Sequence, residues 1–179
     1  MAHLQQKLFF MRVKDKFPNK FKNCTILDIG SLDINGNNRH LFENYQYIGV
    51  DVGAGPNVDV VAKGNEYKSD TLFDIVISSE CFEHDMYYPE TLKNCILLTK
   101  PGGLFTFTCA SDGRAEHGTK RSCPQDAPLL LSLGEWGDYY KNLNEKDIRE
   151  VFNPDEHFSE YHFEYNPSAH DLYFWGVKK

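Results

Sequence analysis

Short apolar runs, several of them ending at an acidic residue or a glycine, dominate the pattern of the first 110 residues. Four of these runs are too short for buried helices and are typical of strands buried on both faces of a parallel sheet. They are CTILDIG (24–30), QYIGVDV (46–52), LFDIVISS (72–79) and LFTFTCA (104–110). VDVVA (58–62) predicts a further short strand between the second and third of them.

The segments between and around these runs have helical patterns. Residues 2–16 place Leu4, Leu8 and Met11, with Phe10 as a further candidate, at helical spacing, which predicts a leading helix that ends before Phe17-Pro18-Asn19. We expect the first crossover helix around residues 37–44. A further helix is predicted over 87–100, since a proline stands near its start and one face is apolar. That face carries Leu92, Cys95, Ile96 and Thr99.

The last third of the chain predicts a helix and a hairpin. Asn144 is a typical N-cap with Asp147 three residues on, so we expect a helix over 144–152. The aromatic-rich stretches HFSEYHFEYN (157–166) and LYFWGVK (172–178) are joined by a short connection with a turn at Pro167-Ser168. They therefore predict two antiparallel strands.

The order of these elements defines a fold class. Strands that alternate with helices imply right-handed crossovers and an α/β fold. We predict a doubly wound, mostly parallel seven-stranded sheet with an antiparallel C-terminal hairpin and helices on both faces. At 179 residues the chain is expected to form a single domain. Its parts are a leading helix (1–20), a core (22–110), a long loop (111–143) and the last helix with the terminal hairpin (144–179).

Composition and charge narrow the possible functions. The net charge of −7 disfavours nucleic acid as a partner, because binding its backbone depends on clustered lysine and arginine. No stretch approaches the roughly 20 apolar residues of a membrane span, and the charged start is unlike a secretory signal, so we expect no membrane association and a cytoplasmic protein. The five cysteines show no CxxC pair and predict buried free thiols. They are Cys24, Cys81, Cys95, Cys109 and Cys123.

The loop after the first strand has the position of a nucleotide-binding loop without its glycines. From Gly30, the dinucleotide pattern GxGxxG requires glycines where the chain has Leu32 and Asn35. Asp33 would also place a negative charge beside a pyrophosphate. A cationic ligand without phosphates reverses this argument, because a carboxylate then attracts it. S-adenosylmethionine, with its sulfonium and ammonium groups, has these properties.

Asp51 supports a nucleoside ligand. It follows the glycine loop by about 20 positions, the spacing at which a carboxylate can accept hydrogen bonds from both ribose hydroxyls. NAD sites share this spacing, so it does not identify which nucleoside binds. An aspartate before glycine is also a common turn residue, which is the alternative interpretation.

Four motifs in order resemble one enzyme family. They are ILDIGS (26–31), YIGVD (47–51), FDIVISSECFEH (73–84) and LLTKPGGLFTFT (97–108). With these motifs the chain resembles the class I S-adenosylmethionine-dependent methyltransferases, whose sheet has seven strands and ends in an antiparallel hairpin. The resemblance implies that the core binds S-adenosylmethionine and that the loop over 111–143 lies on the acceptor side.

The resemblance also implies site residues. The cofactor contacts would be Asp28, Gly30, Ser31, Leu32, Asp33, Asp51, Val52, Gly64, Ser79 and Glu80. Of these, Asp51 would bind the ribose and Val52 would pack on the adenine, while Ser79 and Glu80 would lie beneath the cofactor. The chain departs from the family at Lys63-Gly64, where relatives often have Asp-Ala near the adenine amino group.

Candidates for the chemistry lie after the fourth and fifth strands. His84 is a candidate base, because the pKa of histidine suits that role, and a histidine that orients the loop is the alternative. His117 is a second catalytic candidate. The candidate acceptor contacts are Arg114, Glu116, Tyr139 and Tyr140, with Trp136 as part of a lid. A solvated loop and ordinary packing explain the same residues equally well.

These observations predict a function with two alternatives. We expect methyl transfer from S-adenosylmethionine to a small-molecule acceptor, at an oxygen or nitrogen of a metabolite or sugar-like compound. An NAD-binding Rossmann domain and a non-catalytic methyltransferase-like binding module are the alternatives. No metal site is expected, since His157 and His162 would face opposite sides of one strand.

Overall fold

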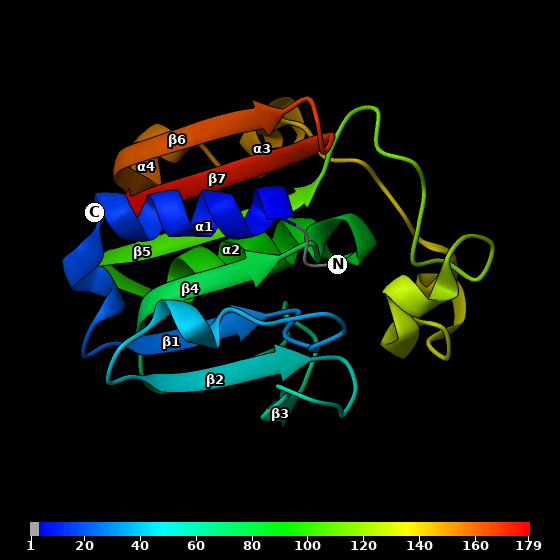
Figure 1. Cartoon of the computed structure of the whole chain (residues 1–179), viewed down its shortest axis with the longest axis horizontal. Coiled ribbons are helices and arrows are strands. Elements are labelled where there is room, and N and C mark those ends of the chain that lie inside the picture. The colour runs from blue at the N-terminus through cyan, green and yellow to red at the C-terminus, as the bar shows by residue number, and fades with distance from the viewer. Residues whose placement is uncertain (1–3) are drawn as a thin grey trace.

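The computed structural model describes residues 4–179 (Figure 1). Within this range seven strands form one sheet in the order β3-β2-β1-β4-β5-β7-β6. They are β1 (Thr25–Ile29), β2 (Gln46–Asp51), β3 (Val60–Val61), β4 (Phe73–Ser79), β5 (Thr99–Ala110), β6 (Phe158–Asn166) and β7 (Asp171–Lys178). The first five are parallel, and β7 runs antiparallel to β5 and β6. The predicted doubly wound sheet with its C-terminal hairpin is confirmed.

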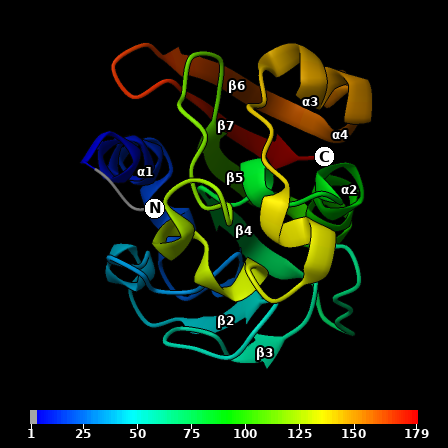
Figure 2. The same ribbon diagram turned by 90° about the vertical axis from the view of Figure 1, so that its right-hand side faces the viewer.

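Helices cover both faces of the sheet, as predicted (Figures 1 and 2). The α-helices are α1 (Leu4–Lys16), α2 (Tyr88–Leu98), α3 (Glu145–Val151) and α4 (Pro154–His157). Alternate residues of a strand point to opposite faces, and β1 divides accordingly between two apolar clusters. Ile26 packs in the cluster of α1, whereas Leu27 packs in the cluster of α2 and α3.

The leading helix forms, and of the positions whose spacing predicted it only Phe10 is buried. Leu4, Leu8 and Met11 are exposed, with Leu4 at 64%. The buried positions of α1 are Gln6, Phe9, Phe10 and Val13. Phe9 stacks on Tyr173 of β7 at a centroid distance of 4.7 Å, and two adjacent phenylalanines bury more apolar area than the alternative stripe. Residues 2 and 3 of the predicted helix lie outside the described residues.

The predicted crossover helix over 37–44 is wrong. The chain forms only a 3₁₀ turn, Arg39–Leu41, between β1 and β2. Asn37 accounts for this, because its side-chain oxygen accepts a hydrogen bond from the Arg39 amide and its carbonyl contacts the ring of His40. Such local bonds compete with helix formation.

The other predicted helices are confirmed. In α2 the predicted apolar face is buried at Leu92, Cys95 and Ile96. Helix α3 begins with a capping box in which the Asn144 side chain accepts from the Asp147 amide at 3.1 Å. The Asp147 carboxylate in turn accepts from the Asn144 amide at 3.0 Å, so the helix start lies where the sequence predicts it.

The long loop is folded rather than extended. It contains three 3₁₀ turns, Pro124–Asp126, Pro128–Leu130 and Gly134–Asp138, and it lies across the carboxyl ends of the parallel strands (Figure 2). Buried Leu130 and Trp136 hold it there. The loop is therefore part of the wall of any site at this edge.

Other expectations have mixed outcomes. All five cysteines are free; three are buried, Cys81 is half-buried and Cys123 is exposed. Among the described residues, no helix has the length and apolar character to cross a membrane. The cytoplasmic location and the division into parts stay predictions.

Strand β1 ends at a glycine that allows two loops to meet. Gly30 has a φ of +77°, and a Cβ placed there would lie 2.4 Å from the Cys81 Sγ. Only glycine combines this left-handed conformation with so close an approach. The contact joins the loop after β1 to the segment after β4 beneath the sheet edge.

We expect Gly30→Ala to lower the free energy of unfolding by about 2 to 4 kcal/mol, from left-handed strain plus overpacking. Gly102→Ala is the matched control, since Gly102 has a φ of +72° and a Cβ added there would meet no other atom within 4 Å. The free energy of unfolding of Gly102→Ala should fall by only about 1 to 2 kcal/mol. Urea denaturation followed by circular dichroism measures both, and equal losses would argue against the contact with Cys81.

Candidate functional site

The carboxyl ends of β1, β2 and β4 border a pocket with an empty volume of about 1050 Å³, which includes its part open to solvent. Adjacent parallel strands bring these ends to one edge of the sheet, where doubly wound proteins bind ligands. Figure 2 looks onto this edge, with the 3₁₀ turns of the long loop in front of the strand ends.

The pocket gathers every predicted cofactor residue except Asp33. The lining includes Asp28, Gly30, Ser31, Leu32, Asp51, Val52, Gly64, Ser79 and Glu80. These residues come from four separate segments of the sequence. Their contacts with a cofactor stay predictions, but their assembly around one cavity agrees with the expectation.

Asp33 has another role. Its Oδ1 accepts from the Gly36 amide at 2.6 Å, and its Oδ2 accepts from the Asn37 side chain at 2.7 Å. The carboxylate thus closes the turn after β1. Both carboxylate oxygens accept hydrogen bonds within the turn, and the contact of Asp33 with a cationic ligand stays a prediction.

Asp51 ties the end of β2 to the loop after β1. Its Oδ2 accepts from the Leu32 amide at 3.0 Å, and its Oδ1 accepts from the Val52 amide at 2.7 Å. Burial raises the pKa of Asp51, and these two hydrogen bonds oppose the rise. Each carboxylate oxygen has a second lone pair, so the group can still accept from ligand hydroxyls.

Asp28 lies buried in the pocket wall. Its Oδ2 accepts from the Tyr47 hydroxyl at 2.5 Å, while its Oδ1 has no hydrogen-bond partner. Burial raises the pKa of Asp28 to about 7, and the bond from Tyr47 opposes this. The hydroxyl of Ser31 is also buried without a partner. Two buried polar atoms without partners in one lining are typical of a site that binds a polar ligand.

The end of β4 is strained. Glu80 has a φ of +51°, a conformation that residues with a Cβ rarely adopt, and its amide donates to the Thr108 carbonyl at 2.8 Å. The neighbouring Ser79 hydroxyl accepts from the Asn38 side chain at 2.8 Å. Backbone strain of this kind clusters at functional sites.

The charges of the lining are mostly negative. Among its described residues the carboxylates are Asp28, Asp51, Glu80, Asp85 and Asp126, and the permanent cation is Lys7. This balance favours a ligand with positive charge and disfavours a pyrophosphate, which needs donors and positive potential.

Two of the predicted acceptor contacts bind the protein itself. Arg114 donates to the Ala169 carbonyl at 2.7 Å and pairs with buried Asp171 at 3.2 Å. Glu116 accepts from Thr119 at 2.7 Å and pairs with Arg121 at 3.0 Å. Neither lines the pocket, because a buried carboxylate and a loop turn need these groups as partners.

The two predicted catalytic histidines lie together. His84 lines the pocket, whereas His117 lies just behind it, with the two ring centroids 4.9 Å apart. Tyr140 packs near both rings, at 5.5 Å and 5.1 Å, and neither it nor Tyr139 lines the pocket. Burial lowers the pKa of both histidines, that of His84 well below its usual value, so both are neutral at pH 7.

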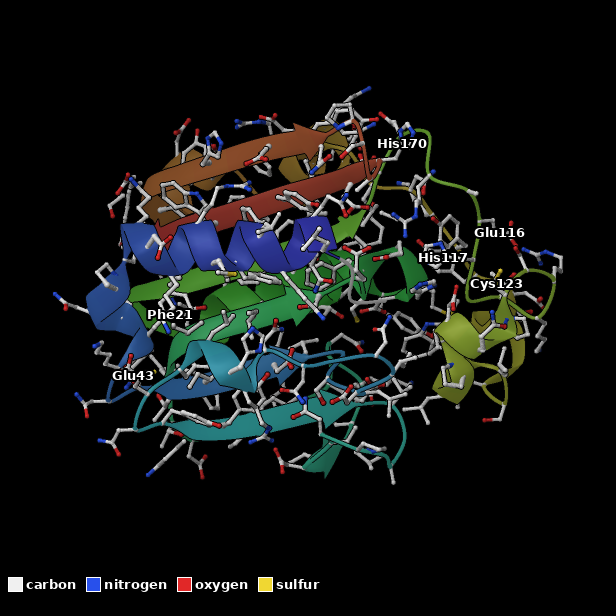
Figure 3. The ribbon with its side chains drawn as sticks, in the orientation of Figure 1. Phe21, Glu43, Glu116, His117, Cys123 and His170 are labelled. Atoms are coloured by element: carbon white, nitrogen blue, oxygen red, sulfur yellow. The ribbon has the colours of Figure 1, made fainter. Side chains whose placement is uncertain are left out.

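Several lining residues were not predicted. From the long loop these are Asp126, Leu129 and Leu130. Trp136, which was predicted as part of a lid, also lines the pocket and donates its indole N–H to the His84 carbonyl at 2.6 Å. The apolar run APLLLSL (127–133) inside a polar loop was the available signal. Helix α1 adds Gln6 and Lys7, for which the sequence has no comparable signal. Figure 3 shows the loop, with Glu116, His117 and Cys123, beyond the strand ends.

Comparison with known proteins places the fold. No family model and no curated protein matches the sequence. One similar structure is the 1,6-didemethyltoxoflavin-N1-methyltransferase from Burkholderia thailandensis, with 1,6-didemethyltoxoflavin and S-adenosylhomocysteine bound. It is 15% identical to this chain in sequence, with a TM-score of 0.60, and the match covers 100% of this chain and 92% of that chain. The N-methyltransferase NodS from Bradyrhizobium japonicum is 15% identical with a TM-score of 0.55, over 94% and 87%.

A third similar structure is a Haemonchus contortus phosphoethanolamine N-methyltransferase 2, in complex with phosphomonomethylethanolamine and S-adenosylhomocysteine. It is 17% identical with a TM-score of 0.59, over 93% of this chain and 52% of that one. The chain therefore has the fold of the class I S-adenosylmethionine-dependent methyltransferases. At these identities the similarity defines the fold alone.

The pKa of Asp28 generates a prediction about stability. Because the pKa is about 7 in the folded chain and near 3.8 in the unfolded one, only the folded state keeps the proton between these values. The contribution of Asp28 to stability therefore falls as the pH rises from about 4 to about 7. We expect the free energy of unfolding of Asp28→Asn, measured relative to that of the wild type, to be higher at pH 8 than at pH 5 by at least about 1 kcal/mol. Urea unfolding at both values measures it.

The exposed Asp70→Asn serves as the control for loss of one negative charge. A difference between wild type and Asp28→Asn that is the same at both pH values would contradict the raised pKa.

Proposed function

We propose that this protein binds S-adenosylmethionine in the pocket at the ends of β1, β2 and β4, and transfers its methyl group to a small molecule. The observation that carries the proposal is the acid-lined pocket at this edge of a methyltransferase fold. Two of the similar structures hold S-adenosylhomocysteine beside a small-molecule ligand, which supports both halves of the proposal.

The residues present fit this cofactor. The partnerless oxygens of Asp28 and Ser31 offer acceptors for an ammonium group, and the surplus of carboxylates favours a sulfonium. Asp51 would hold the ribose hydroxyls, since both of its oxygens keep a free lone pair. Val52 offers an apolar surface for the adenine. The absence of a GxGxxG pattern argues against a dinucleotide.

When bound, S-adenosylmethionine supplies a methyl group whose transfer forms a C–O or C–N bond on the acceptor, breaks the S–C bond and leaves a neutral thioether. The chain itself positions the reactants and excludes water, which is the main contribution to such a displacement. Leu129, Leu130 and Trp136 close the pocket from the loop side. Neutral His84 at its wall offers a ring-nitrogen lone pair toward the bound acceptor.

The acceptor is proposed to be a small molecule with an oxygen or nitrogen nucleophile. The net charge of −7 supports this over nucleic acid. Arg114 binds the Ala169 carbonyl and Glu116 bonds within its own loop. We therefore assign recognition of the acceptor to groups around His84 and Trp136 instead.

We expect S-adenosylhomocysteine, added to the purified protein in a calorimeter, to bind at one site per chain, and NADH not to bind. Asp51→Asn should weaken this binding by about 1.5 to 3 kcal/mol, or roughly ten- to hundredfold, because charged hydrogen bonds are lost. Glu150→Gln, far from the pocket on α3, should leave it unchanged. Binding of NADH in place of S-adenosylhomocysteine would overturn the proposal.

A separate experiment distinguishes an enzyme from a binding module. The protein is incubated with S-adenosylmethionine labelled in its methyl group and with a fractionated metabolite extract. We expect a labelled small molecule that is absent when heat-inactivated protein is used. Cofactor binding without any labelled product across all fractions would favour the non-catalytic module.

A further inference from the structure

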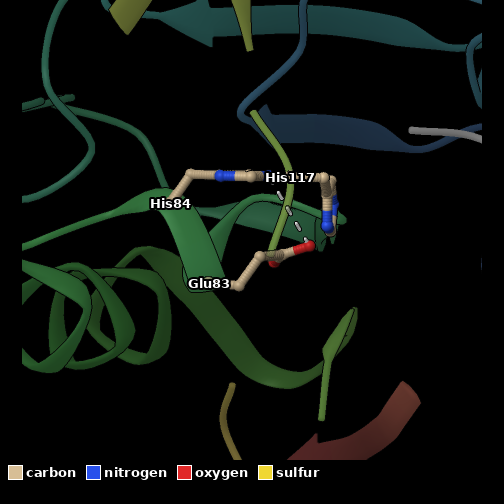
Figure 4. Close-up of side chains that lie close together, drawn as sticks. All are labelled: Glu83, His84 and His117. Carbon is tan, nitrogen blue, oxygen red and sulfur yellow. Dashed lines mark ion pairs between the residues drawn. The ribbon is translucent and has the colours of Figure 1, made fainter. Parts of the chain in front are cut away.

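Three buried side chains that can bind a metal meet beside the pocket. They are Glu83 and His84, in the 3₁₀ turn after β4, and His117, in the long loop. One ligand atom from each lies within 4.8 Å of the others. Figure 4 shows the three side chains directed toward one another. We call them the Glu-His-His cluster.

Most of the polar side-chain atoms in the cluster are buried without a hydrogen-bond partner. The side chains are almost completely buried, with Glu83 at 0%, His84 at 4% and His117 at 7% exposure. Both carboxylate oxygens of Glu83 and both ring nitrogens of His84 have no hydrogen-bond partner. The one pairing between them, His84 Nε2 to Glu83 Oε1 at 4.0 Å, is too long for a hydrogen bond.

Leaving such groups buried and unsatisfied is costly. Each orphaned polar atom costs about 1 to 3 kcal/mol, and a charged one costs more. The cluster therefore predicts an additional group that all three side chains bind. A cation can bind the carboxylate oxygens and the imidazole lone pairs at once.

His117 is oriented for such a ligand. Its Nδ1 lies 3.1 Å from the Ala115 carbonyl, so this nitrogen carries the proton and donates it. The lone pair is then on Nε2, which has no partner. A backbone carbonyl that fixes the tautomer in this way is typical of metal-binding histidines.

The backbone around the cluster is fixed as well. The Glu83 carbonyl accepts from the Lys141 amide at 2.9 Å, and the His84 carbonyl accepts from the indole of Trp136. Gly118 has a φ of +65°, and a Cβ there would lie 2.6 Å from the His84 ring. Glycine at this position lets the loop bring His117 against His84, so the long loop and the end of β4 assemble the cluster together.

We propose that the Glu-His-His cluster binds a divalent transition-metal ion such as Zn²⁺. Two imidazoles and one carboxylate are a common ligand set for such ions, and magnesium prefers oxygen ligands. At a tetrahedral Zn²⁺ with metal–ligand distances of about 2.0 to 2.2 Å, two ligand atoms lie roughly 3.3 to 3.6 Å apart. Binding would therefore draw together ligand atoms that now lie within 4.8 Å of one another. The expectation of no metal site, which considered only His157 and His162, is replaced by this proposal.

The position of the cluster would let a bound metal ion take part in the proposed methyl transfer. Three protein ligands leave coordination positions open, and His84 also lines the pocket proposed for the cofactor. A hydroxyl oxygen of the acceptor bound at an open position would have a lowered pKa and would be held near the transferred methyl group. This part rests on the proposed function and favours a hydroxylated acceptor.

The test uses the full chain, stripped with a chelator and dialysed against Zn²⁺ or Mg²⁺. We expect the wild type to retain one equivalent of Zn²⁺ and no Mg²⁺, and its thermal midpoint to rise with Zn²⁺. Glu83→Gln and His117→Gln should each weaken Zn²⁺ binding at least tenfold. His162→Gln, which removes an exposed histidine on β6, should bind Zn²⁺ as the wild type does.

Folding of each variant is checked by circular dichroism, and the unmutated protein provides the thermal readout if a variant does not fold. Wild type without bound Zn²⁺ and without a thermal shift would overturn the site, as would equal binding by His117→Gln and His162→Gln. Calorimetry with S-adenosylhomocysteine on the same samples separates the two proposals. Cofactor binding without Zn²⁺ binding contradicts the metal site alone, and the reverse contradicts the proposed function.

Discussion

The hydrogen bonds of one half-buried carboxylate hold the site in shape. Asp51 accepts from the amides of Leu32 and Val52 and so joins the ends of β1 and β2. The loop after β1, which has no crossover helix behind it, is shaped as well by the Asp33 turn and by bonds to the segment after β2, from the Asn57 side chain to the Ser31 carbonyl and from the Asp33 amide to the Pro56 carbonyl. The same carboxylate faces the pocket, so the group that organises the backbone also presents charge to a ligand.

Much of the fold follows from local patterns in the sequence. The runs of β1, β4 and β5 are too short for buried helices and too uniformly apolar for amphipathic ones. The capping box at Asn144 marks the start of one helix. The strand-end positions of Asp28, Asp51 and Glu80 then follow from the parallel sheet, since its strand ends share one edge. The sheet topology is therefore enough to predict that these three acidic residues lie near one another.

Most of the features that the sequence did not predict depend on contacts between residues far apart in the chain. Helix α1 has two apolar stripes, and only the tertiary fit to Tyr173 selects the one with Phe9. In the long loop, the partners of Arg114 and Glu116 are set by contacts that no periodicity encodes. His117 reaches Glu83 and His84 only because Gly118 permits a close approach, so a metal-ligand pattern is not visible in the sequence spacing.

The order of strands has a consequence for synthesis. Strand β7 lies between β5 and β6, and it pairs Leu104 with Val177, more than seventy residues away. Until residues 171–178 leave the ribosome, the apolar edge of β5 has no neighbour on that side, and such an edge invites pairing with other chains. The same edge borders the start of the long loop. Nascent chains are therefore most exposed to aggregation just before the site can assemble.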